Sequence, residues 1–119
     1  MSQIASFYLI RNKQRQMLHD GNCSGAVYMA IWDWCECELD LDMRFTAPQT
    51  EDTLDCVLID KELAFRLLKA LKEHDIHELA AEIAPDWDLS TEAVQEGLET
   101  LNAHLKLVNS DTALLYEMT

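Results

Sequence analysis

Cysteine and histidine are the residues of this sequence whose types could support metal or thiol chemistry. Cys35 and Cys37 are separated by one residue, and His19 and Cys23 lie upstream of them. Structural zinc sites usually take cysteine pairs two to four residues apart, with a second pair at a similarly tight spacing. Two positions apart, side chains diverge by about 200° on a helix and share a face only on a strand. The more ordinary interpretation is that these cysteines are small, partly buried apolar residues.

A second pair, His74 and His77, has the His-x-x-His spacing that can bind a transition metal when both residues lie on one helix. Asp75, between them, is better explained as a helix N-cap, because Glu78 three positions later completes a capping box. We therefore expect the two histidines to straddle a helix junction in solvent. His104 has no partner that the sequence reveals.

The sequence contains no motif that is specific for an enzyme class. A nucleophile elbow, a glycine-rich phosphate loop and an H-E-x-x-H helix are all absent from it. One enzymatic alternative stays open, a small metal- or thiol-dependent enzyme that uses His19, Cys23, Cys35 and Cys37. A thiol at Cys23 would precede a helix N-terminus, where the thiol pKa falls. The expectation from motifs is a protein that is not an enzyme and needs no cofactor.

Acidic residues dominate the middle of the sequence. From residue 33 to residue 60 there are nine acids and one base, Arg44. Residues 35–45 alternate between apolar and charged types, which on an extended chain places acids about 7 Å apart in a row. At that spacing neighbouring carboxylates repel by about 0.6 kcal/mol in water. The acids of this row are Glu36, Glu38, Asp40 and Asp42.

Two tryptophans border the predicted row. We expect one of Trp32 and Trp34 to be buried and the other to be exposed as an aromatic anchor, since interfaces combine such anchors with complementary charge. Glu51 and Asp52 extend the same acidic region. The predicted partner-binding residues are therefore these two tryptophans, the four acids of the row, Glu51 and Asp52.

The net charge limits the classes of partner. The 119 residues carry 22 acids against nine lysines and arginines, a formal net charge of −13. Nucleic acids and anionic membranes are unfavourable partners for such a chain, because both are bound through lysine and arginine. A basic protein surface is the natural complement. With no apolar run of 18 residues and no signal-peptide layout, the expected location is the cytoplasm, with reduced cysteines.

Periodicity and capping residues predict one domain over residues 1–119. The expected elements are a strand at 4–10, a short helix at 11–19, a helix at 24–38, an extended piece to 45, a strand at 54–59, helices beginning after Asp60, Asp75 and Ser90, and a strand at 112–118. Pro85 should stop the helix before it. Gly97, in the middle of the last helix, suggests a close contact between helices. The fold class is α+β or α/β, with a sheet of three to four strands covered by about four to five helices.

Two short stretches carry a resemblance to a known group of proteins. Residues 4–8 (IASFY) and 24–28 (SGAVY) resemble small bacterial proteins of the YfbM-like kind. That resemblance implies a compact cytoplasmic α+β domain and supplies no catalytic residues. Small acidic domains of this sort also resemble immunity proteins, which neutralise a toxin. The leading hypothesis is therefore an acidic binding domain for a basic toxin or effector, and a homodimeric structural or housekeeping protein is the second alternative to it.

Overall fold

The computed structural model describes residues 4–18, 24–41 and 55–118 of the chain. In chain order the elements are β1 (Ala5–Arg11), β2 (Gln14–Leu18), α1 (Gly25–Glu38), β3 (Asp55–Ile59), α2 (Lys61–Lys72), α3 (Ile76–Ile83), the 3₁₀ helix η1 (Ala84–Trp87), α4 (Thr91–Leu105) and β4 (Thr112–Met118). The strands form one four-stranded sheet in the order β2-β1-β4-β3. Every pairing is antiparallel, so the fold is α+β rather than α/β.

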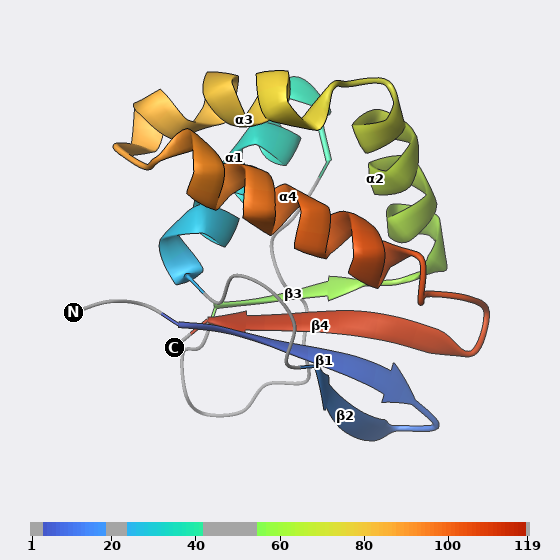
Figure 1. Ribbon diagram of the computed structural model, residues 1–119. Coiled ribbons are helices and arrows are strands. Elements are labelled where there is room, and N and C mark those ends of the chain that lie inside the picture. The colour runs from blue at the N-terminus through green and yellow to red at the C-terminus, as the bar shows by residue number, and fades with distance from the viewer. Residues whose placement is uncertain (1–3, 19–23, 42–54, 119) are drawn as a thin grey trace.

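The helices form a layer on one face of the sheet (Figure 1). Alternate residues of the strands point into this layer, and the neighbours Phe7, Tyr116 and Val57 on β1, β4 and β3 are all buried. The helical layer lies over β1, β4 and β3, whereas β2 extends beyond it (Figure 1). Among the residues that the structure describes, no helix has both the length and the apolar character that a membrane crossing requires.

The prediction of a short helix at residues 11–19 is wrong. Residues 11–18 instead complete a hairpin, in which Arg11 pairs with Gln14 across a two-residue turn. Both turn residues, Asn12 and Lys13, have positive φ values of 53° and 65°, the pattern of a type I′ turn. Asparagine tolerates this region and favours the hairpin. The backbone groups of β2 are satisfied by β1, a partner that local periodicity does not reveal.

Replacing Lys13 by glycine should stabilise the protein. A lysine Cβ is strained at positive φ, whereas glycine adopts this region freely and Asn-Gly is the preferred type I′ pair. We expect Lys13→Gly to raise the free energy of unfolding by about 0.5–1 kcal/mol in urea titrations. Lys13→Ala removes the same charge but keeps the Cβ, so an equal gain in that variant would contradict a backbone origin.

Three helices begin at the side-chain caps that the sequence predicted. Asp60, Asp75 and Ser90 each accept a hydrogen bond from the backbone N–H three positions later, at 2.9, 3.0 and 3.2 Å. Each cap satisfies a donor that the first helical turn leaves unpaired. Helix α3 ends at Ile83, and Pro85 lies in η1, as its missing N–H requires.

Helices α1 and α4 approach each other closely at Gly97, which confirms the predicted helix contact. A Cβ at this position would lie 2.5 Å from Cγ1 of Val27, a distance too short for two carbon atoms. The hydroxyl of Tyr28 donates to the carbonyl of Gly97 at 3.4 Å. Glycine at this position therefore lets the two helices pack with their backbones near one another.

Gly97→Ala should destabilise the protein even though alanine is the better helix former. Overpacking against Val27 costs about 1–3 kcal/mol, and the gain in helix propensity offsets about 1 kcal/mol of it. We expect a net loss of up to about 2 kcal/mol in the free energy of unfolding. Combining the change with Val27→Ala should cost less than the sum of the two single changes. A stabilised Gly97→Ala protein would show that the helices separate freely.

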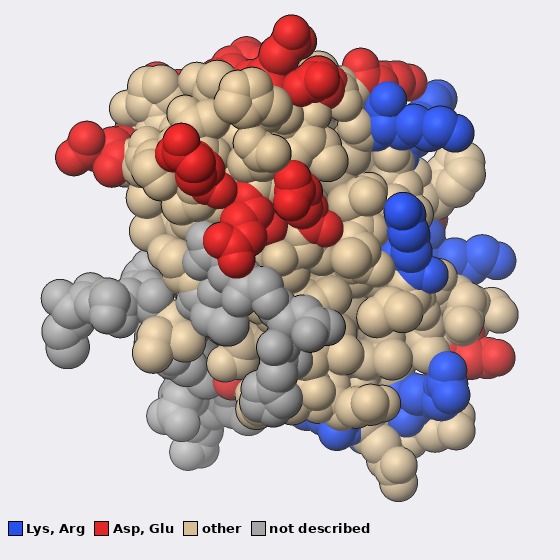
Figure 2. All heavy atoms as spheres, viewed as in Figure 1, with Lys and Arg blue, Asp and Glu red and all other residues tan. Residues whose placement is uncertain are grey.

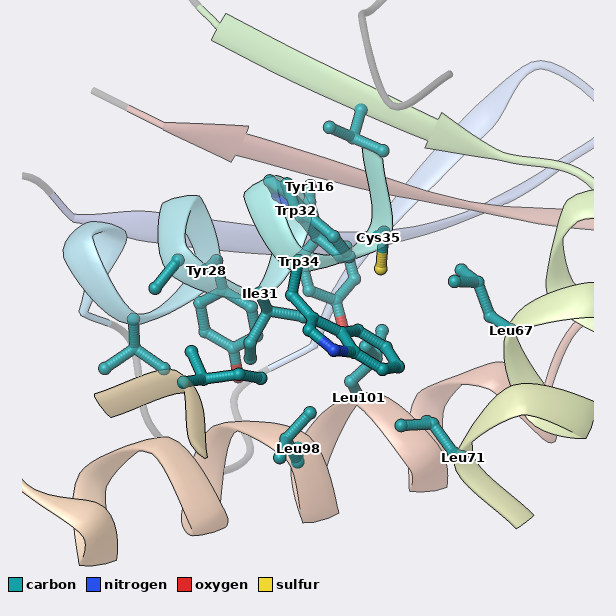
Figure 3. Packing of buried hydrophobic residues seen from close by; sticks show 14 of the residues in the cluster. Tyr28, Ile31, Trp32, Trp34, Cys35, Leu67, Leu71, Leu98, Leu101 and Tyr116 are labelled. Atoms are coloured by element: carbon teal, nitrogen blue, oxygen red, sulfur yellow. The ribbon is translucent and has the colours of Figure 1, made fainter. Parts of the chain in front are cut away.

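The core beneath the helices is centred on Tyr116 of β4. Its ring lies 4.7 Å from that of Phe7, and 5.3 Å from those of Tyr28 and of Trp32, measured between centroids. Its hydroxyl lies 2.9 Å from Nδ1 of the buried His104 on α4. This one side chain therefore contacts β1, α1 and α4 (Figure 3).

Candidate functional site

Both predicted anchor tryptophans belong to the core. Trp32 is 5% exposed and Trp34 is 8% exposed, so the expectation that one of them is exposed is wrong. Figure 3 shows Trp32 beside Tyr116 and Trp34 on the side of α1 that faces Leu71 and Leu101. Helix α1 packs against the sheet through Tyr28 and Trp32, and against α3 and α4 on its other sides. Side chains that diverge by about 200° from such a helix both meet buried surroundings.

The predicted row of acids does not form. Glu36 and Glu38 lie in the last turn of α1, and Asp40 follows the helix with a φ of 53°. The backbone N–H groups of Leu39 and Leu41 both donate to the carbonyl of Cys35, so this part of the chain is coiled rather than extended. On the helix Cys35 and Leu39, four residues apart, turn toward the core, whereas Cys37 is exposed, so the alternation does not describe this segment. The remaining predicted residues, Asp42, Glu51 and Asp52, lie outside the described part of the chain.

The acids of α1, α3, η1 and α4 instead lie on segments that lack basic residues, since these helices contain no lysine or arginine. Their acids, which we call the acidic surface, are Asp33, Glu36, Glu38, Glu78, Glu82, Asp86, Glu92, Glu96 and Glu99. In the described ranges none of these carboxylates forms an ion pair. Figure 2 shows acids over the top, left and middle of this view and basic residues mainly along its right edge, where Figure 1 places α2 and the β1–β2 turn.

Part of the acidic surface is hollowed between α1 and the α3–η1 segment. The hollow has a volume of about 190 Å³ and is lined by the carboxylates Asp33, Glu38, Glu82 and Asp86 together with Trp34 and Trp87. We call it the acidic hollow. Trp87 is 38% exposed, so its ring is available to a partner. A lysine or arginine side chain would meet both carboxylates and an aromatic ring in such a hollow.

Trp87 is the aromatic residue of the site that the sequence reasoning missed. It lies in η1 directly after Pro85 has ended α3, between Asp86 and Asp88. A tryptophan between two acids, just beyond a helix stop, was the available signal. Asp88 has a φ of 53° and reverses the chain, which leaves Trp87 at the edge of the helical layer.

The two cysteines of α1 have different environments, and neither is an activated thiol. Burial is the main reason that the pKa of the Cys35 thiol is raised to about 12, and the negative charge of the neighbouring Glu36 raises it further. Cys37 is exposed, and the pKa of the Cys37 thiol is raised mainly by the negative charge of Asp33. Both shifts favour the protonated form at neutral pH, which opposes thiolate catalysis or metal binding at these positions.

The histidines also have separate neighbours. His74 lies between α2 and α3, with its ring 5.5 Å from that of Trp34, so the predicted helix junction is confirmed. Nδ1 of His77 lies 2.9 Å from Oε1 of Gln95. Within residues 4–18, 24–41 and 55–118, no group of three histidine, cysteine or acidic side chains is placed to hold a metal ion. His19 and Cys23 lie outside these ranges.

Comparison of the chain with protein-family models, with curated proteins and with solved structures gives no match.

The thiol of Cys37 should report the electrostatic field of the acidic hollow. Because Asp33 raises its pKa, Asp33→Asn should increase the thiolate fraction and speed alkylation of Cys37 by iodoacetamide at about pH 8. Mass spectrometry of the digested protein would give the rate at this cysteine alone, with Cys35 unlabelled in the folded protein. Glu62→Gln on α2 removes one negative charge elsewhere, and an equal acceleration in that control would contradict a local effect.

Proposed function

We propose that this chain is a protein-binding domain that receives a basic protein on its acidic surface. The observation that carries the proposal is the acidic hollow, in which carboxylates from α1, α3 and η1 surround a partly exposed tryptophan. Unlike the alternating row expected from the sequence, these groups come from separate segments of the chain and meet in one place.

The charge distribution supports electrostatic steering of a partner. The protein has a formal net charge of −13, and α1, α3, η1 and α4, which carry the acidic surface, contain no lysine or arginine. A surface of one sign attracts a partner of the opposite sign and orients it before contact. Trp87 would then supply the desolvated aromatic contact that holds the complex together.

The partner that best fits this chemistry is a toxin or effector with a positively charged working surface. A nuclease is one example, because it must bind phosphates through lysine and arginine. A protein that covers such a surface with its own carboxylates blocks access of the substrate. The proposed role is therefore that of an immunity or inhibitor protein.

Capture of the partner should depend on the acids of the hollow. The bait proteins are the native chain and the triple variant Asp33→Asn, Glu82→Gln, Asp86→Asn, presented to an extract of the native cell at low salt. A basic protein should bind the native chain and be lost from the variant. Its association rate should fall about tenfold or more between about 0.05 and 0.5 M salt, since screening removes the steering.

A matched control has the same net charge change at acids that do not line the acidic hollow. The triple variant Glu62→Gln, Glu73→Gln, Asp111→Asn neutralises exposed acids outside the acidic surface, and it should retain the partner. Trp87→Ala should weaken binding about tenfold with little change in association rate. Equal retention by both triple variants, or an association rate that is indifferent to salt, would show that the acidic surface is not the binding site.

A further inference from the structure

Among the strands that the structure describes, β2 has a hydrogen-bonding neighbour on one side only. It is a terminal strand of the sheet, beside β1. Four of its five residues are exposed, from both faces of the sheet, because the helical layer does not extend over it (Figure 1). Met17 is 47% exposed, which is high for a methionine within a strand. In the described part of the chain, its outer edge is therefore open to another strand.

The turn decides which backbone groups point to that edge. In a two-residue hairpin the pair that flanks the turn, here Arg11 and Gln14, exchanges hydrogen bonds within the hairpin. Alternation along the strand then directs the N–H and C=O groups of Gln14, Gln16 and Leu18 toward β1. The same groups of Arg15 and Met17 point outward, and no strand within residues 4–18, 24–41 and 55–118 pairs with them.

The edge strand reads QRQML, with no proline and no lysine, two residues that often prevent pairing between sheet edges. Its one charge, Arg15, forms an ion pair with Glu117 at 3.4 Å and lies 5.7 Å from the ring of Tyr8. These contacts hold the guanidinium over the sheet, where the Arg15 side chain stays 47% exposed.

We propose that β2 pairs with β2 of a second copy of this chain, in antiparallel register about a two-fold axis at Gln16. In that register Arg15 lies opposite Met17 of the partner subunit, and Met17 lies opposite Arg15 of the partner subunit. These are the two residues with outward backbone groups, so each pair exchanges two hydrogen bonds. The two sheets become one continuous sheet of eight strands, built from the four strands of each copy.

The distribution of charge favours a second copy as the occupant of this edge. Two chains of net charge −13 repel each other, but residues 4–18 contain no acid. The two-fold axis places no like charges directly opposite, and it holds the two Lys13 turns apart by about 20 Å, well beyond the screening length. The hairpin edge is therefore where two copies approach with the least repulsion between their carboxylates.

The proposed dimer does not depend on the proposed function. The response to salt distinguishes the two associations. Salt screens the repulsion between two chains of the same net charge, so dimerisation should strengthen severalfold between about 0.05 and 0.5 M sodium chloride. Binding of a basic partner to the acidic surface should weaken over the same range. A β-strand from an acidic protein, added to the same basic hairpin, would also bind less tightly as salt rises.

The first experiment is sedimentation velocity of the complete chain at concentrations up to about 1 mM, in the range where small interfaces associate. The expected result is a reversible monomer–dimer equilibrium in about 0.5 M salt. A chain that stays monomeric under these conditions overturns the proposal, as does a dimer that dissociates when salt is raised.

Substitutions at Met17 test the register. Met17→Glu places a carboxylate opposite Arg15 of the partner subunit and should tighten the dimer about threefold to tenfold, whereas Met17→Lys should weaken it by a similar factor. Net charge alone predicts the opposite order, because Met17→Lys makes the chain less negative. Met17→Gln is the neutral control and should stay within about twofold of the native chain. Similar effects of Glu and Lys would place the interface elsewhere.

A cross-link gives a second measurement of the same register. Gln16→Cys places two thiols beside the two-fold axis, at a pair whose backbones approach closely enough for a disulfide. Mild oxidation should join position 16 of one copy to position 16 of the other, as mapped by mass spectrometry. Gln14→Cys, two residues nearer the turn, should not form the equivalent bond. Cross-linking of both variants alike would contradict the proposed axis.

Discussion

The hydrogen bond between Tyr116 and His104 is the constraint on which the arrangement of the core depends. Both side chains are buried, and a buried polar group without a partner is costly. Their contact ties α4 to the central strand β4, while the rings around Tyr116 tie α1 and β1 to the same point. Burial raises the pKa of the Tyr116 hydroxyl well above its usual value, so the hydroxyl stays neutral in this apolar setting.

The position of α1 follows from this core and produces the acidic surface. Because α1 packs against Tyr116 on one side and contacts α4 through Gly97, its tryptophans are drawn into the interior. The carboxylates of the same helix are left on its outer side. There they adjoin the acids of α3 and η1 and form the acidic hollow. Burial of aromatic side chains and exposure of carboxylates are thus two results of one packing arrangement.

The two proposed interaction surfaces lie on parts of the molecule with different charge. The helical layer carries acids without bases on α1, α3, η1 and α4, whereas the β1–β2 hairpin carries bases without acids. The hairpin extends beyond the helices, so its surroundings differ from those of the hollow (Figure 1). A dimer through β2 would leave both acidic hollows free, and the two associations could therefore occur together.

The sequence by itself determined the elements whose causes are local. Side-chain caps fixed the starts of α2, α3 and α4, and Gly97 predicted a helix contact, because these signals act within a few residues or through the absence of a side chain. Only the tertiary structure decided that residues 14–18 form a strand, since its hydrogen bonds come from β1. It also decided that Trp32 and Trp34 are buried and Trp87 partly exposed, because burial depends on what packs against a helix from other parts of the chain.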